Sequence, residues 1–234
     1  MDAQDGLFDG EGKPRTALYA LRNVLGRVSV FTRGDRKLYY PYAEFAADVI
    51  LCAKEADGGA AEVRAQLFLW NGTEVASRSF TASLHSAAQE VGVLRAQLPW
   101  ECRDGLVLRL QCWRGGILVA QNHAYYACVD ENGEKRPFPL ADVTEGIEGG
   151  TRVLYNASHA VAAGVTVLCG GKALLRHGAL LPLERIELAW KGEVVVKYGN
   201  PIEKGGAAVV SQRILRGVFP HSDTAPADSQ AGNQ

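Results

Sequence analysis

Two pairs of neighbouring acidic residues are the side chains of this sequence best suited to acid–base chemistry. Glu101 and Asp104 flank one predicted turn, and Asp130 and Glu131 open another. Glycoside hydrolysis needs two carboxyl groups held about 5–10 Å apart across a sugar. Acidic residues are also common in turns for solvation alone, so we interpret both pairs as solvated turn residues. The sequence therefore gives no catalytic residue.

The histidines and cysteines show no spacing typical of a metal or nucleophile site. No HxxxH, HxH or GxSxG motif occurs, and the five histidines are scattered: His85, His123, His159, His177 and His221. The cysteines are odd in number and form no CxxC motif: Cys52, Cys102, Cys112, Cys128 and Cys169. We expect reduced thiols, no bound metal and no cofactor. A bridge between Cys52 and Cys112 is disfavoured, because the two residues have opposite parity on their strands.

Aromatic and basic side chains give two further candidate binding surfaces. Aromatic faces stack on sugars, and the sequence has four tryptophans: Trp70, Trp100, Trp113 and Trp190. Each lies at the end of a predicted strand, where tryptophan commonly packs against the edge of a core. We therefore prefer core or interdomain packing over a sugar-binding platform. The basic run Arg33–Lys37 is interpreted as a solvated loop rather than an anion site.

The composition excludes several classes of protein. Apolar residues make up 47% and charged residues 22%, which is typical of a soluble globular chain. With 25 basic and 26 acidic residues, the chain has no bulk attraction for nucleic acid or an anionic membrane. The acidic N-terminus lacks a signal peptide, and the longest weakly polar stretch is about half a membrane span. These features predict a cytoplasmic protein.

One helix is expected before the predicted strands begin. Pro14 suits the first helical position and Gly26 suits the residue after the end. The apolar residues at helical spacing form one stripe: Ala17, Leu18, Leu21, Val24 and Leu25. A short helix is marginal without burial of such a stripe. The stripe could fold back on the first sandwich, but we expect it to stay frayed in the isolated chain and to promote self-association.

After Gly26 the hydrophobic period becomes two, which predicts an immunoglobulin-like sandwich. Its strands are expected at Val28–Thr32, Glu44–Ala53, Glu62–Trp70, Glu74–Phe80, Val91–Leu98, Gly105–Trp113 and Ile117–Tyr126. The alternation places Leu67 and Leu108 in the core, and Gln66 and Arg109 on the solvent face. Asn71-Gly72 predicts a two-residue type I′ hairpin. Arg114-Gly115-Gly116 predicts a second hairpin.

A second, smaller immunoglobulin-like domain is expected after a polar linker. Its strands are predicted at Thr151–Ala157, Val161–Cys169, Leu180–Trp190, Glu193–Tyr198 and Ala207–Leu215. The fold class is therefore all-β, with one short helix in front. The predicted division is residues 1–27 for the helical segment, 28–129 for the first domain, 130–149 for the linker, 150–217 for the second domain and 218–234 for a disordered tail.

Four stretches carry a resemblance to a known family. The opening Gly6–Leu21 resembles the segment that closes the catalytic barrel of family 2 glycoside hydrolases, especially the β-mannosidase branch. Gly105–Tyr126 is similar to the end of the β-sandwich that follows the barrel in that family. Asn156–Val167 and Leu180–Glu184 resemble parts of its final immunoglobulin-like domain. The usual glycine of the last stretch is Leu183 here.

The resemblance implies an accessory role rather than catalysis. In that family both catalytic carboxylates lie in the barrel, upstream of the matching segment, and no residue here corresponds to them. The chain is therefore expected to be a non-catalytic β region that supports a catalytic barrel. Other expected partners are a carbohydrate and a second copy of the chain. The alternatives are a stand-alone carbohydrate-binding or adhesion module and an intact small enzyme of unknown type.

Overall fold

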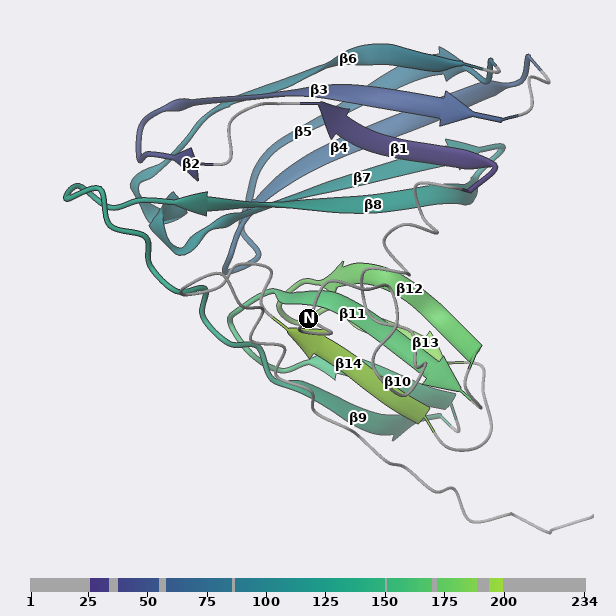
Figure 1. Cartoon of the computed structure of the whole chain (residues 1–234). Helices are drawn as coiled ribbons and strands as arrows, with labels where there is room; N and C mark the ends of the chain where they lie inside the picture. Colours follow the sequence, from purple (N-terminus) through teal and green to yellow (C-terminus); the bar gives the residue numbers. More distant parts are fainter. Residues whose placement is uncertain are drawn as a thin grey trace, which may run out of the picture.

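A computed structural model describes residues 26–33, 38–54, 58–85, 87–149, 151–169, 172–188 and 194–199. These residues form four β-sheets, arranged as two sandwiches that lie one against the other (Figure 1). The predicted helix up to Gly26 and the predicted strand Ala207–Leu215 lie outside this part of the chain. Within it, no helix is long and apolar enough to cross a membrane.

The first sandwich pairs a three-stranded sheet, in the order β1-β3-β6, with a five-stranded sheet, in the order β2-β8-β7-β4-β5. Its strands are β1 (Val28–Arg33), β2 (Leu38–Tyr39), β3 (Glu44–Ala53), β4 (Ala60–Leu69), β5 (Glu74–Ser83), β6 (Ala88–Gln97), β7 (Leu106–Arg114) and β8 (Ile117–Cys128). A short 3-10 helix, η1 (Trp100–Asp104), joins β6 to β7. All seven predicted strands are present within a few residues. The short β2, which runs parallel to β8, was not predicted.

The predicted register of this sandwich is confirmed. Leu67 of β4 pairs with Leu108 of β7, and both side chains are fully buried in the core between the two sheets. The next pair along, Gln66 and Arg109, has the opposite parity. Alternation of apolar and polar residues therefore identified the core face correctly.

The two expected hairpins differ in outcome. Gly115 and Gly116 have φ angles of 53° and 79°, as the two central residues of a type I′ turn require. At the other hairpin only Gly72 has a positive φ, so the predicted two-residue type I′ turn is wrong. Instead, four residues join β4 to β5. The N–H of Trp70 donates to the carbonyl of Gly105 at 3.0 Å, which continues the pairing of β4 with β7 by one residue.

The second sandwich consists of two three-stranded sheets, β13-β10-β9 and β12-β11-β14. The strands are β9 (Val143–Glu148), β10 (Thr151–Asn156), β11 (Ala162–Cys169), β12 (Lys172–Leu180), β13 (Arg185–Leu188) and β14 (Val194–Gly199). Their facing sides enclose a separate small core whose fully buried members include Leu154, Val165, Val167, Leu180 and Val196.

Here the structure departs from the sequence expectations at three places. The expected linker 130–149 contains β9, which forms because Val143 is buried and the whole segment pairs with β10. Strand β12 was not predicted. The expected strand Leu180–Trp190 is interrupted by a turn, because Pro182 offers no backbone N–H and Leu183 has a φ of 63°. The division of the chain into domains stays a prediction.

Candidate functional site

The acidic residues considered for catalysis make contacts that stabilise turns. One carboxylate oxygen of Asp130 accepts hydrogen bonds from the backbone N–H groups of Asn132, at 2.9 Å, and Glu134, at 3.0 Å. The carboxylate of Asp104 lies 4.0 Å from the guanidinium of Arg136. The contacts of Asp130 are those of an Asx turn, whereas that of Asp104 is an exposed ion pair.

The histidines and cysteines form no metal site in the described part of the chain, where no group of three potential ligands occurs. His123 is buried, whereas His85 and His159 are exposed. The side chain of His177, the whole of His221 and the side chain of Cys169 lie outside the described structure. The other cysteines are free thiols, so Cys52 and Cys112 are not bridged.

Two of these thiols lie in contact and fasten η1 to the end of β8. Cys102 and Cys128 are both buried in the core of the first sandwich. A hydrogen bond between the two side chains lowers the pKa of Cys102 and raises that of Cys128, and burial raises the latter further. The pair therefore holds Trp100, at the start of η1, in a fixed place relative to the turn that follows β8.

Trp70 is the centre of the junction between the two sandwiches. It is only 1% exposed, and its ring centroid lies 4.2 Å from that of Phe138 and 6.2 Å from that of Tyr125. Its indole N–H donates to the carbonyl of Pro139 at 3.0 Å, and its own carbonyl accepts from Val161 at 2.9 Å. Trp70 is therefore a packing residue of the buried cluster between the two sandwiches.

An apolar cluster surrounds this tryptophan and joins the two cores. Its buried members come from both sandwiches and from the segment between them: Phe68, Trp70, Val107, Ala127, Phe138, Ala160, Val161, Ala163 and Ala179. Phe68 and Val107 have the outward parity of their strands and would face water in an isolated sandwich. They are buried because the second sandwich covers this part of β4 and β7.

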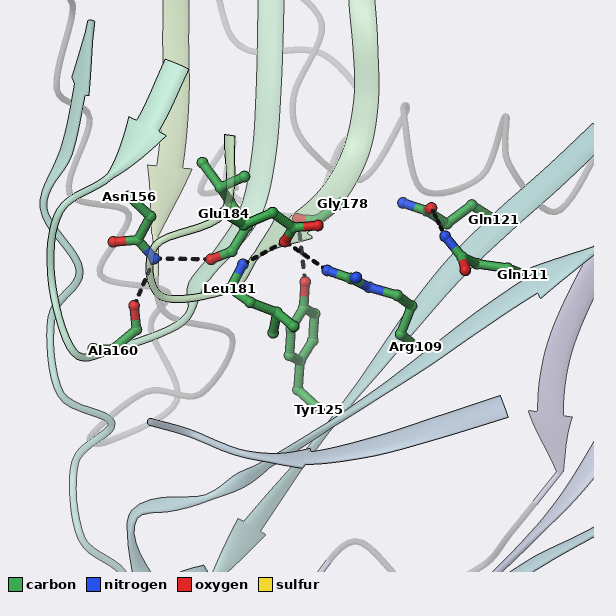
Figure 2. Close-up of polar contacts among 10 residues, drawn as sticks. Arg109, Gln111, Gln121, Tyr125, Asn156, Ala160, Gly178, Leu181 and Glu184 are labelled. Carbon is green, nitrogen blue, oxygen red and sulfur yellow. Dashed lines mark hydrogen bonds and ion pairs between the residues drawn. The ribbon is translucent and has the colours of Figure 1, made fainter. Parts of the chain in front are cut away.

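The polar edge of the junction contains an ion pair (Figure 2). The guanidinium of Arg109 donates to the carboxylate of Glu184 at 2.6 Å, and the same oxygen accepts from the N–H of Leu181 at 2.7 Å. The Arg109 side chain is only 12% exposed, so the expectation that it faces solvent is wrong. The strand parity was right, but the outer face is covered by the second sandwich.

Two more polar residues fix the backbone at this interface. The hydroxyl of Tyr125 donates to the carbonyl of Gly178 at 3.3 Å and accepts from the N–H of Gly164 at 3.2 Å. The fully buried amide of Asn156 donates to the carbonyls of Ala160, at 2.8 Å, and Leu180, at 2.9 Å (Figure 2). Asn156 therefore shapes the loop that presents Ala160 to Trp70. The sequence analysis had assigned no structural role to Asn156.

A separate aromatic cleft opens at one end of the first sandwich. It has a volume of about 500 Å³ and is lined by Tyr40, Pro41, Tyr42, Trp100 and the turn 130–133. The rings of Tyr42 and Trp100 are stacked at 6.2 Å with an angle of 26°. Of the four candidate tryptophans, the half-buried Trp100 thus lines this cleft. Trp113 is half-buried, and Trp190 lies outside the described residues.

The tyrosines of this cleft were missed by the sequence analysis. Tyr40 and Tyr42 are 54% and 67% exposed and lie in the irregular segment between β2 and β3. The signal available was the aromatic run Tyr39–Tyr42 outside any alternating pattern. Asp130 and Glu131, considered for catalysis, also line the cleft. The structure therefore brings one candidate tryptophan, Trp100, and one candidate acidic pair into the lining of the same cleft. Glu101 and Asp104 are not among its lining residues.

No family model matches the chain, and no curated protein matches it in sequence. A β-D-mannosidase from Dictyoglomus thermophilum has a similar structure, with a TM-score of 0.52 and 11% identity over 78% of this chain and 22% of that chain. A candidate β-galactosidase from Bacteroides fragilis has a TM-score of 0.32 and 12% identity, over 55% of this chain and 18% of that chain. The Escherichia coli chaperone DraB has a TM-score of 0.29 and 13% identity, over 74% of this chain and 92% of that chain.

Of these three structures, the mannosidase is similar enough to bear on the fold. At 11% identity it establishes a distantly shared all-β architecture, similar to that found in a glycosidase. This chain spans about a fifth of the length of that enzyme. The β-galactosidase and the chaperone are too different in structure to support an argument about this chain.

Proposed function

We propose that the chain is a non-catalytic β-sandwich region of a glycoside hydrolase, whose role is to support a catalytic barrel. The observation that carries this proposal is the likeness to the β-mannosidase, which extends over 78% of this chain and occupies 22% of that enzyme. A match of this extent includes residues of both sandwiches. The resemblance of Gly6–Leu21 to the segment that closes a family 2 barrel supports the same assignment.

The junction suits a supporting role. Trp70, Phe138 and the ion pair of Arg109 with Glu184 hold the two sandwiches together through buried contacts. Interfaces between domains that move freely are more polar and lack such a core. A rigid pair of sandwiches presents a fixed surface, as a scaffold for another domain requires.

Activity assays on the purified chain test the non-catalytic part of the proposal. We expect no hydrolysis of p-nitrophenyl β-D-mannoside or β-D-galactoside above the buffer rate. Glycosidases need two carboxyl groups preorganised across the sugar, whereas Asp130 is engaged in its own turn. Hydrolysis by the chain that disappears in the Glu131→Gln or Asp104→Asn variant would overturn this part of the proposal.

Immunoprecipitation of the native protein tests the association with a barrel. An antibody raised against this chain is used on extracts of the source cells, and the precipitate is assayed on the same two substrates. We expect glycosidase activity in the precipitate, whether the barrel lies on the same polypeptide or on a bound partner. Precipitation with antibody preincubated with purified chain is the control. A precipitate that contains the chain but hydrolyses neither substrate nor other aryl glycosides would contradict the proposal.

A further inference from the structure

We propose that the aromatic cleft formed by Tyr40, Tyr42, Trp100 and the turn 130–133 binds a neutral carbohydrate. A pyranose ring would lie on the exposed tyrosine faces beside the half-buried Trp100, and its hydroxyl groups would bond to polar groups of the turn 130–133. This site is additional to the supporting role proposed above and does not depend on it. The volume of about 500 Å³ is within the usual range for small-ligand sites, roughly 300–1,000 Å³.

The backbone of Tyr42, whose side chain is exposed, adopts an energetically unfavourable conformation. Its φ angle is 62°, a left-handed conformation that is unfavourable for a bulky side chain. The N–H of Tyr42 donates to the carbonyl of Leu98 at 3.0 Å, and the N–H of Ala43 donates to that of Tyr40 at 3.1 Å. The Gln97 amide also donates to the carbonyl of Tyr42. These bonds fix a strained turn that exposes two tyrosine rings, and strain of this kind concentrates at ligand sites.

The other parts of the cleft are equally well fixed. Trp100 is anchored through η1, because Cys102 is buried against Cys128 at the end of β8. In the turn 130–133, Asp130 accepts from Gly133 at 3.0 Å through its backbone carbonyl and donates to the carbonyl of Glu134 at 2.9 Å. Binding therefore orders little of the protein, and preorganised sites of this kind lose less affinity to conformational entropy.

The charges around the cleft favour a neutral ligand. Asp130 and Glu131 are among the residues that line the cleft, and their negative charge opposes an anion such as a uronic acid or a phosphate. The guanidinium of Arg103 lies 5.4 Å from the centroid of the Trp100 ring, so this face already carries a cation and opposes a second one. A polyol has apolar ring faces for the aromatic residues and hydroxyl groups for Glu131 and Asn132. Carbohydrates therefore fit both features of the cleft.

Isothermal titration of the full chain with neutral oligosaccharides tests this proposal. The probes are β-1,4-mannohexaose, cellohexaose and β-1,4-galactotetraose, with choline and glucuronate as charged comparisons. We expect at least one neutral oligosaccharide to bind, and neither charged compound to do so. Tyr42→Ala and Trp100→Ala should each weaken binding about tenfold or more, which corresponds to about 1.4 kcal/mol.

Two further variants keep the result interpretable. Tyr155→Ala removes a half-buried aromatic residue of the second sandwich and should leave the affinity unchanged. If Trp100→Ala does not fold, as judged by circular dichroism, the exposed Tyr42→Ala carries the test alone. Absence of binding to all three oligosaccharides, tighter binding of choline or glucuronate, or binding that Tyr42→Ala leaves intact would each overturn the proposal. None of these results alters the immunoprecipitation outcome, so the two proposals fail separately.

Discussion

Leu183 occupies a backbone conformation that its side chain disfavours. It has a φ of 63° in the turn where Pro182 follows Leu181 and the N–H of Glu184 donates to the Leu181 carbonyl at 3.0 Å. Proline followed by a positive φ is the pattern of a type II turn, whose third position favours glycine. The resembling family has glycine at this position, which agrees with the geometry.

Replacement of Leu183 by glycine should therefore stabilise the chain. Left-handed backbone costs a non-glycine residue about 1–2 kcal/mol, and part of the gain is offset by the flexibility of glycine in the unfolded chain. We expect Leu183→Gly to raise the free energy of unfolding by about 0.5–1 kcal/mol. Urea denaturation measures the change. Leu183→Ala keeps the strain and should not stabilise, so an equal gain from alanine would contradict the explanation.

Arg109 is expected to matter more for stability than its strand parity suggests. Arg109→Ala would leave Glu184 without its charged partner at a partly buried site, at a cost of about 1–3 kcal/mol. Gln66→Ala, at the paired position of β4, should cost about 0.5 kcal/mol or less. Denaturant midpoints of the two variants give the comparison. Equal effects would mean that the second sandwich does not cover this face in solution.

At the scale of the elements, the strands that were predicted correctly are those with a regular alternation of apolar and polar residues. The alternation in β3, β4 and β7 placed Leu67 and Leu108 correctly, because one face of each strand is apolar. Strand β9 escaped prediction because most of its residues are polar or glycine and its pairing with β10 forms it. The aromatic cleft was missed because Tyr40 and Tyr42 lie in an irregular segment, whose course depends on hydrogen bonds to Leu98 and Gln97.

Two buried groups, the hydroxyl of Tyr125 in β8 and the thiol of Cys112 in β7, should make the folded chain less stable at high pH. Burial raises the pKa of Tyr125 from 10.0 to about 12 and that of Cys112 from 9.0 to about 11. Both groups are neutral in the fold and ionise more readily when unfolded. Their stabilising effect is therefore complete below about pH 9 and decreases between about pH 9 and 12.

A shift of about two pH units corresponds to about 3 kcal/mol for each group. Urea denaturation at pH 8, 10 and 11.5 should show this decrease. Cys112→Ala removes one of the buried groups whose pKa is raised, so its stability should fall less steeply between pH 9 and 11. An unchanged slope in this variant would show that Cys112 does not contribute.

For the whole molecule, the junction determines whether the two sandwiches unfold together. The core of the second sandwich is small, and small cores are marginal alone. Its contact with Trp70 and Phe138 adds apolar burial shared by both halves. We expect calorimetry of the chain to show one cooperative transition.

Trp70→Ala should separate this transition into two. Loss of a buried tryptophan costs about 3–5 kcal/mol, and here the loss falls on the contact between the sandwiches. Trp113→Ala serves as the matched control, because Trp113 is half-buried near the other end of the five-stranded sheet. It should lower the melting temperature while leaving one transition. Two transitions already present in the unmodified chain would show that the junction does not couple the sandwiches.

The burial of β4 and β7 on both sides has a consequence for amide hydrogen exchange. Where Gln66–Leu69 pairs with Leu106–Arg109, each strand has a neighbour on both edges, one core on its inner face and the Trp70 cluster on its outer face. Local fraying cannot bring these N–H groups into contact with water, so deuterium enters only when the molecule opens completely. The slowest-exchanging amides of the chain should lie here, and their rate reports the global free energy of unfolding.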